Sequence, residues 1–238
     1  MKDNLVSAIK KGDYLIVKSL VKERDQRRLN AIDSDGLSPF HRSIIRGSLS
    51  IVKFLMKRGA DIRQRTGKGL NALELAIYCN NRALINFFVK LFHRSELSRV
   101  LHTASALNDR KTVSFLITNG ANVNFRDAKK STALHWAAQE NAIEAGKELI
   151  LRGARINVLD ALKFTPLSIS SSEGNIEFVR LLLNNRAKVN QRVEGGSALH
   201  NAYAWQHKDV GNLLLKFGAN PNLKDDEGNL PQDFLNNR

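Results

Sequence analysis

The sequence predicts an all-α fold, in which helix–turn–helix units stack into a solenoid. Three observations support this prediction: a regular period in the histidine contexts, a Gly-Ala marker in the same phase, and an apolar helical stripe before that marker. Self-similarity at a fixed period of about 20 to 50 residues is typical of repeat architectures.

The histidine contexts define the period. The step along the chain from His102 to His135 recurs from His135 to Ser168, and a step one position shorter leads from Ser168 to His200. This step, about 33 positions, lies within the range of helical repeat units. His41 stands in the same context, and one step beyond it the chain carries Glu instead of His. The last four copies of the Gly-Ala marker show the same two equal steps and one shorter step.

Each element of the motif has a structural reason. Pro39 and Pro166 suit a first helical turn, because that backbone N–H has no helical partner and the proline ring presets φ. The Ser or Thr just before is expected to act as N-cap. Alanines in the middle of the first helix allow neighbouring helices to approach closely, at positions 76, 104, 137 and 202.

The second helix of each unit carries apolar residues at i, i+1, i+4 and i+5, a spacing that buries one helix face. Examples are Ile51-Val52 with Leu55-Met56 and Phe178-Val179 with Leu182-Leu183. A glycine then stands where a helix C-cap requires a positive φ, at positions 59, 120, 153 and 218.

The period divides the chain into an N-terminal cap, six repeats and a C-terminal cap, within one array over residues 1–238. Residues 1–32 are predicted to form an N-terminal capping unit, and residues 225–238 a truncated C-terminal one. The repeats between them are predicted at 33–65, 66–94, 95–126, 127–159, 160–191 and 192–224.

The segments around Ser38-Pro39-Phe40-His41 and Thr132-Ala133-Leu134-His135 are similar to the T-P-L-H-x-A signature of the ankyrin-repeat family, and the resemblance covers essentially the whole chain. It implies an ankyrin-repeat solenoid with connecting β-hairpin loops, which binds through its hairpin tips and the exposed side of its first helices, and these line a concave groove. It also implies that the four in-phase histidines are structural and bond groups of the turn region.

The sequence departs from the pattern in two ways. The separation of His41 and His102 is five positions short of two periods, so the protruding hairpin should be absent or reduced to a tight turn between residues 91 and 97. Lys130 and Lys163 replace the glycine before the motif, and Arg186 replaces a C-cap glycine, which makes these turns candidates for a different geometry.

The residues present do not support catalysis. The in-phase histidines fall in different repeats, and His93 and His207 lack the spacing of a metal site. Thr66-Gly67-Lys68-Gly69 resembles a phosphate loop but falls where the repeat needs its turn glycine. The single cysteine, Cys79, excludes an intramolecular disulfide and a cysteine-based zinc cluster. We therefore expect no enzyme, no catalytic residue, no cofactor and no metal.

Repeat phase and the resemblance together indicate the partner-binding positions. The candidates are Leu159, Leu162, Phe164, Trp205, Trp136, Tyr78, Leu70, Leu107, Ile45 and Arg46. Tip positions are normally polar, so the apolar group in the C-terminal half favours an interaction site with aromatic anchors. The competing interpretation, packing between hairpins, is preferred for Trp136 alone.

Net charge is +14, with 15 Lys/Arg against 7 Asp/Glu in residues 1–65 and 22 against 16 in the rest. This basic excess favours an acidic partner, although an ordinary solvated surface would also explain it. The leading hypothesis is a non-catalytic protein–protein interaction module or adaptor that binds a peptide or protein partner in the groove.

The alternative is an electrostatic binder of nucleic acid, nucleotide or acidic lipid through a basic N-terminal surface, made of Lys10, Lys11, Lys22, Arg24, Arg27 and Arg28. No window approaches the roughly 18 apolar residues of a membrane span, and the N-terminus lacks the apolar run of a signal peptide. We expect no membrane span, a monomer when alone, and an intracellular, cytoplasmic location with the nucleus left open.

Overall fold

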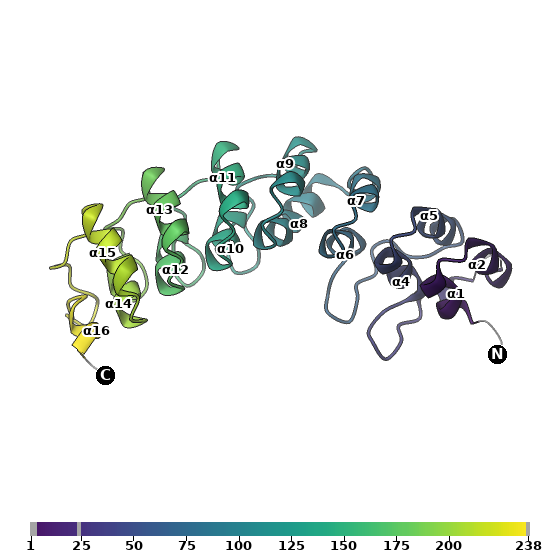
Figure 1. Ribbon diagram of the computed structural model, residues 1–238, viewed down its shortest axis with the longest axis horizontal. Helices are drawn as coiled ribbons and strands as arrows, with labels where there is room; N and C mark the ends of the chain where they lie inside the picture. The colour runs from purple at the N-terminus through teal and green to yellow at the C-terminus, as the bar shows by residue number, and fades with distance from the viewer. Residues whose placement is uncertain (1–3, 23–24, 237–238) are drawn as a thin grey trace. The chain divides into compact units, whose positions relative to one another are not determined.

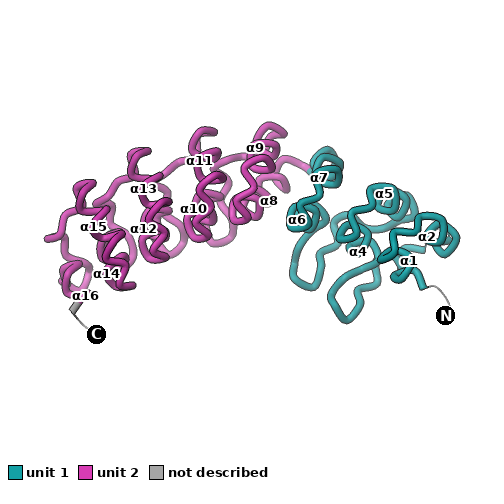
Figure 2. Tube along the Cα trace, in the orientation of Figure 1, with its two compact units in different colours: residues 1–92 teal, residues 93–238 magenta. Residues whose placement is uncertain are grey.

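A computed structural model describes residues 4–22 and 25–236 as a succession of short helices (Figure 1). The chain divides into two compact units, residues 1–92 (unit 1) and 93–238 (unit 2), which Figure 2 colours separately. Each unit is described by itself.

The helices of unit 1 are α1 (Leu5–Lys11), α2 (Tyr14–Leu20), α3 (Gln26–Asn30), α4 (Pro39–Arg46), α5 (Leu49–Lys57), α6 (Ala72–Tyr78) and α7 (Arg82–Val89). Those of unit 2 are α8 (Arg94–Ala106), α9 (Arg110–Thr118), α10 (Ala133–Gln139), α11 (Ile143–Leu151), α12 (Pro166–Ser172), α13 (Ile176–Asn184), α14 (Ala198–Ala204), α15 (Lys208–Lys216) and α16 (Asp233–Asn236).

In unit 2 the helices form two rows (Figure 1). The first helices of the repeats, α8, α10, α12 and α14, pack in succession, and the second helices, α9, α11, α13 and α15, pack in a parallel row. Unit 1 repeats the pattern, since α1 contacts α4 and α4 contacts α6, while α2 contacts α5. The predicted all-α solenoid is therefore confirmed.

The predicted core positions are buried. Ala76, Ala104, Ala137 and Ala202 have no exposed surface, as close packing between first helices requires. The apolar stripe of the second helices is buried at Ile51, Val52, Leu55, Phe178, Val179, Leu182 and Leu183. Met56, also expected in this stripe, is half-buried.

The predicted caps form at the starts of α4 and α12, whereas Ser197 at the start of α14 makes no side-chain cap bond. Ser38 accepts a hydrogen bond from the His41 N–H, and Thr165 accepts one from the Ser168 N–H. The prolines stand in the first turn of α4 and of α12. In α6, Asn71 and Glu74 form a capping box, so each of these first helices begins through local side-chain chemistry.

The connecting loops contain turns where paired strands were expected. Within the described ranges there is no β-strand, and Val193 and Gly196 form an isolated bridge. In the loop of residues 127–131, the Asp127 carboxylate accepts the N–H groups of Lys129 and Ser131 at 2.8 and 2.9 Å. The side chain thus satisfies donors that a strand ladder would otherwise use.

The expectation of a different geometry at the lysine and arginine positions is wrong. Lys130 and Lys163 have φ of 57° and 60°, in the left-handed region where their counterparts Gly36 and Gly69 have 74° and 79°. Arg186 has φ of 67°, where the C-cap glycines of the other repeats have 85° to 99°. The surrounding hydrogen bonds impose this conformation on an L-residue, although it is strained there by roughly 1–2 kcal/mol.

Replacing one of these residues by glycine should relieve the strain. We expect Lys130→Gly to raise the free energy of unfolding by about 0.5–1 kcal/mol, since relief of the left-handed strain exceeds the added chain entropy. Arg180→Gly, within α13, should lower it by about 1 kcal/mol. Urea unfolding of both variants checks the opposite signs, and a loss of stability in Lys130→Gly would contradict the strain argument.

The short spacing removes the loop before α8, as predicted. α7 ends at Val89 and α8 begins at Arg94, so a short link joins them where the other repeats have a longer loop. His93 is the N-cap, and its backbone N–H donates to the Glu96 carboxylate at 2.8 Å. Residues that form a turn elsewhere belong here to a helix of 13 residues.

Candidate binding surface

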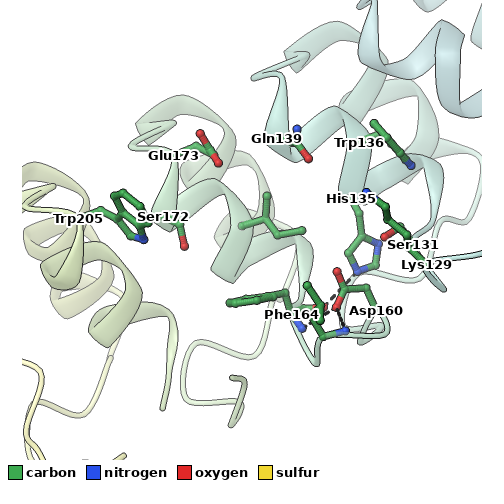
Figure 3. A pocket seen from close by; sticks show the side chains of 12 residues that line it. Lys129, Ser131, His135, Trp136, Gln139, Asp160, Phe164, Ser172, Glu173 and Trp205 are labelled. Carbon is green, nitrogen blue, oxygen red and sulfur yellow. Dashed lines mark hydrogen bonds between the residues drawn. The ribbon is translucent and has the colours of Figure 1, made fainter. Parts of the chain in front are cut away.

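A pocket of about 310 Å³ lies along the first helices of unit 2 and will be called the groove pocket (Figure 3). Its lining comes from two loops and from α10, α12 and the end of α14. The lining residues are Lys129, Ser131, His135, Trp136, Gln139, Asp160, Leu162, Phe164, Ile169, Ser172, Glu173 and Trp205.

The loop before α12 presents the two apolar tip residues. Asp160 Oδ1 accepts the N–H groups of Leu162 and Phe164, each at 2.9 Å, and Lys163 takes the left-handed conformation between them. The Ala161 N–H donates to Lys129 O at 2.8 Å and ties this loop to the preceding one. As a result the Leu162 side chain is 67% exposed.

Trp205 stands at the C-terminal end of α14 and is 65% exposed. Around it, the Asn201 side-chain amide donates to Ser172 Oγ at 3.2 Å, and the His207 ring contacts Ser172 O at 2.9 Å. These contacts join α14 to the end of α12. The indole therefore stands on a fixed backbone with most of its surface exposed, and Figure 3 shows its place in the pocket lining.

Trp136 forms a hydrogen bond within its own repeat. Its indole N–H donates to Asp127 Oδ2 at 3.0 Å, and the residue is half-buried. In the first repeat, Arg42 occupies the same register and makes the same kind of contact with Asp33 at 2.8 Å. This bond ties the indole to the loop of its own repeat, and the ring also lines the groove pocket; packing of Trp136 between hairpins stays a prediction.

The histidine of this pocket is fully engaged. His135 Nδ1 accepts the Thr132 N–H at 3.1 Å, and its Nε2 contacts Val158 O at 3.1 Å and Phe164 O at 3.3 Å. Burial lowers the pKa of His135 below its ordinary value, so the ring is neutral at pH 7. Neither nitrogen is available to act as a base on a ligand.

His41 and His200 make the corresponding contacts. His41 bonds the cap at Ser38 and reaches Gln64 O, whereas His200 bonds Ser197 and reaches Asn229 O. His102 differs: it contacts Arg99 O at 3.0 Å, and its Nε2 has no partner among the described residues. The reason is that α8 is continuous through this position, so a cap like Ser38 is missing.

The rim of the groove pocket is polar and of mixed charge. Lys129, Gln139 and Glu173 are exposed there. The carboxylate of Asp160 accepts backbone N–H groups of its own turn. Apolar anchors surrounded by polar groups are the arrangement found in protein interfaces.

The ten predicted partner-binding positions do not lie in one place. Leu162, Phe164, Trp205 and Trp136 line the groove pocket, whereas Leu159 and Leu107 belong to unit 2 but lie outside its lining. The other four lie in unit 1: Ile45, Arg46, Leu70 and Tyr78.

These remaining positions show mixed exposure. Ile45, Tyr78 and Leu107 are exposed, and Leu70 and Leu159 are half-buried. Arg46 lies with its guanidinium against the C-cap glycine of α1. Leu159 also offers its carbonyl to the Arg126 side chain at 2.6 Å.

Sequence reasoning missed Ile169, a lining residue on α12. Repeat phase offered a signal, because Ile169 follows Ser168 as Trp136 follows His135. Of the basic N-terminal residues, Lys10, Lys11, Lys22, Arg27 and Arg28 are exposed, and Arg24 lies outside the described residues. Arg28 donates to Leu20 O at 3.0 Å and lies 3.7 Å from the Asp25 carboxylate.

In residues 4–22 and 25–236, no group of three or more His, Cys, Asp or Glu side chains is placed to hold a metal ion. Over the same residues, no helix is both long enough and apolar enough to cross a bilayer.

Comparison with known proteins gives one consistent family. A model of ankyrin repeats, three copies long, matches residues 5–96, 89–160 and 134–225. The Notch-regulated ankyrin repeat-containing protein of Xenopus tropicalis is 31% identical over 94 residues, which are 39% of this chain and 82% of that protein.

Two longer relatives match over a small part of their length. Ankyrin repeat and SAM domain-containing protein 6 of Rattus norvegicus is 32% identical over 87 residues, 36% of this chain and 10% of that protein. Palmitoyltransferase AKR1 of Lachancea kluyveri is 35% identical over 72 residues, 30% of this chain and 10% of that protein.

Proposed function

The chain belongs to the ankyrin-repeat family, and from that premise we propose that it is a non-catalytic adaptor that holds a peptide or protein partner in the groove pocket of unit 2. Ankyrin repeats generally mediate protein–protein interaction. The observation that carries the proposal is the gathering of Leu162, Phe164, Trp205 and Trp136 around one pocket of about 310 Å³.

The exposure of two of these side chains supports a macromolecular partner, whereas Phe164 and Trp136 are half-buried. Trp205 and Leu162 leave about two-thirds of their surface to solvent, at 65% and 67%. Burying large apolar side chains typically stabilises by about 1.5–3 kcal/mol each, and aromatic anchors dominate interface energetics. Lys129, Gln139 and Glu173 at the rim would supply polar contacts that orient the partner.

The absence of a catalytic role is part of the proposal. Repeats of this family typically act without chemistry of their own. Both ring nitrogens of His135 form hydrogen bonds, one to the helix cap at Thr132 and the other to the carbonyl of Val158. The palmitoyltransferase is matched over 10% of its length, so the activity in its name is not transferred to this chain. A monomeric state and a cytoplasmic location stay predictions.

A displayed peptide library selected on the full chain tests the proposal. We expect the selected peptides to bind Phe164→Ala/Trp205→Ala at least about 30-fold more weakly than the original chain, because loss of an anchor typically costs about 2 kcal/mol or more. Leu151→Ala is the matched control, since Leu151 is 72% exposed and lies outside the pocket lining. Its binding should be unchanged.

Folding must be checked beside binding. The melting temperature of Phe164→Ala/Trp205→Ala should fall by no more than about 5 °C, because Trp205 is 65% exposed and Phe164 is a half-buried loop residue outside the repeat core. Intact binding together with a large fall in melting temperature would show that these residues pack between repeats and do not anchor a partner.

A second candidate function rests on charge. Unit 1 contains 18 Lys/Arg and 8 Asp/Glu, a net charge of +10 out of the +14 of the chain. We infer that an electrostatic binder of nucleic acid, nucleotide or acidic lipid would act through this unit. Its affinity should fall steeply as salt rises from about 50 to 200 mM, by about 10³-fold for six phosphate contacts, whereas groove binding should change little.

A further inference from the structure

A second cavity lies on the second helices of unit 1 and will be called the outer cavity. Its volume is about 660 Å³, and the residues that line it come from α2, α5 and α7: Tyr14, Ser50, Lys53, Phe54, Met56, Lys57 and Phe87. Loops that precede the first helices project from the side of α4 and α6, while α5 and α7 lie on the other side of unit 1 (Figure 1). This face was not among the predicted binding positions.

Three aromatic side chains from three helices form its walls and floor. The Tyr14 and Phe54 rings meet edge to face with centroids 5.8 Å apart. Phe54 is 8% exposed and forms the floor, whereas Tyr14 is 37% exposed and forms a wall. Lys53 Nζ lies 5.3 Å from the centroid of the third ring, that of Phe87.

Two lysines stand at the mouth on one face of α5. Lys53 and Lys57 are one helical turn apart, so their side chains point the same way, and both are exposed. In the described part of the chain, neither forms an ion pair with a carboxylate. Their charges are therefore available to a partner.

The helices around the cavity carry no opposing charge. The sequences of α2, α5 and α7 contain no Asp or Glu, whereas α11, α13 and α15 in unit 2 each contain at least one. The +10 charge of unit 1 extends this positive field. An apolar cavity with a cationic mouth is complementary to an apolar side chain flanked by carboxylates.

We propose that the outer cavity binds an acidic peptide segment of a partner protein. One large apolar side chain of that segment enters between Tyr14, Phe54 and Phe87, and Asp or Glu residues beside it pair with Lys53 and Lys57. This site is separate from the groove pocket and does not depend on it. The chain would then hold two partners, one on each unit.

The ring geometry favours a peptide over a nucleic acid. Bases bind by stacking on exposed aromatic faces. Here the Phe87 face carries Lys53, and Phe54 is almost fully buried. An apolar side chain, aliphatic or aromatic, can enter between the rings without an open ring face on which to stack.

An array of acidic peptides tests the proposal with the full chain. Each probe carries a central Phe, Leu or Trp flanked by two acidic residues on each side. Two matched probes serve as controls. In one, the acidic residues are replaced by Asn or Gln; in the other, the central residue is replaced by Ala. We expect the best acidic probe to bind below about 1 mM, and both matched probes to bind at least about 10-fold more weakly.

Two variants locate the binding. Lys53→Ala/Lys57→Ala should weaken the best probe at least about 10-fold, while Lys216→Ala/Lys224→Ala, a matched change of two lysines in unit 2, should leave it unchanged. Helical content by circular dichroism confirms that both variants fold. Failure of every probe to bind, equal binding by the Lys53/Lys57 variant, or displacement by a single-stranded oligonucleotide at equal concentration would overturn the proposal.

Discussion

Phe178→Ala is expected to lower the free energy of unfolding by about 3–5 kcal/mol, the range for removing a buried ring. Phe178 lies on α13 and has no exposed surface. It fills the space beside Gly146 of α11, where an added Cβ would come within 2.7 Å of a ring carbon. Since each repeat contacts only its neighbours, the loss falls on the α11–α13 interface.

Urea unfolding of the full chain measures this change. Phe217→Ala is the matched control, because Phe217 is 39% exposed at the end of α15 and its loss should cost about 1 kcal/mol or less. If both variants lose the same stability, the ring of Phe178 is not the packing element described here.

The pair with Gly146 gives a stricter test. Gly146→Ala alone should destabilise by about 1–3 kcal/mol through overpacking, although alanine is the better helix former by about 1 kcal/mol. In Phe178→Ala/Gly146→Ala the added methyl group occupies space left by the ring. The double variant should therefore lose at least about 1 kcal/mol less than the sum of the two single changes; strict additivity would contradict direct contact.

Acidification from pH 7 to pH 5 is expected to destabilise the fold through three histidines. Burial lowers the pKa of His41, of His135 and of His200 below the ordinary value. The unfolded chain therefore binds protons at a higher pH than the folded chain. Stability is fully present above about pH 6.5 and is lost as pH falls through the folded pKa values.

The size of this loss has an upper bound. Each histidine contributes at most about 1.4 kcal/mol per pH unit within its window. Carboxyl groups titrate at lower pH than these histidines. The hydrogen bond from Arg42 lowers the pKa of Asp33, so the stability that Asp33 contributes is lost only below about pH 4. On a plot of unfolding free energy against pH, the loss due to the histidines and the loss due to the carboxyl groups therefore fall in separate pH ranges.

His135→Gln isolates one histidine. Glutamine keeps polar groups near the cap and does not titrate, so the slope between pH 7 and pH 5 should become shallower by up to about 1.4 kcal/mol per pH unit. Gln139→Asn is the control, because Gln139 is exposed and does not titrate, so this change should leave the slope as it is. An unchanged slope in His135→Gln would assign the acid sensitivity to other groups.

The sequence by itself determined the repeat and its helices. The repeat period, the cap at Ser38, the proline of α12 and the small Ala137 each reflect a few residues that recur in phase. Because caps, first-turn prolines and apolar stripes are local chemistry, their meaning does not depend on distant parts of the chain. The same logic predicted the missing loop before α8.

Only the tertiary structure decided which side chains share a surface. Phe164 and Trp205 line one pocket although they belong to different repeats, and Tyr14 and Phe87 line another across three helices. The left-handed turn at Lys163 and the bond from Trp136 to Asp127 also depend on neighbouring contacts. The physical reason is that the period sets where each helix begins, whereas packing between successive repeats sets which way a side chain points and how much of it stays exposed.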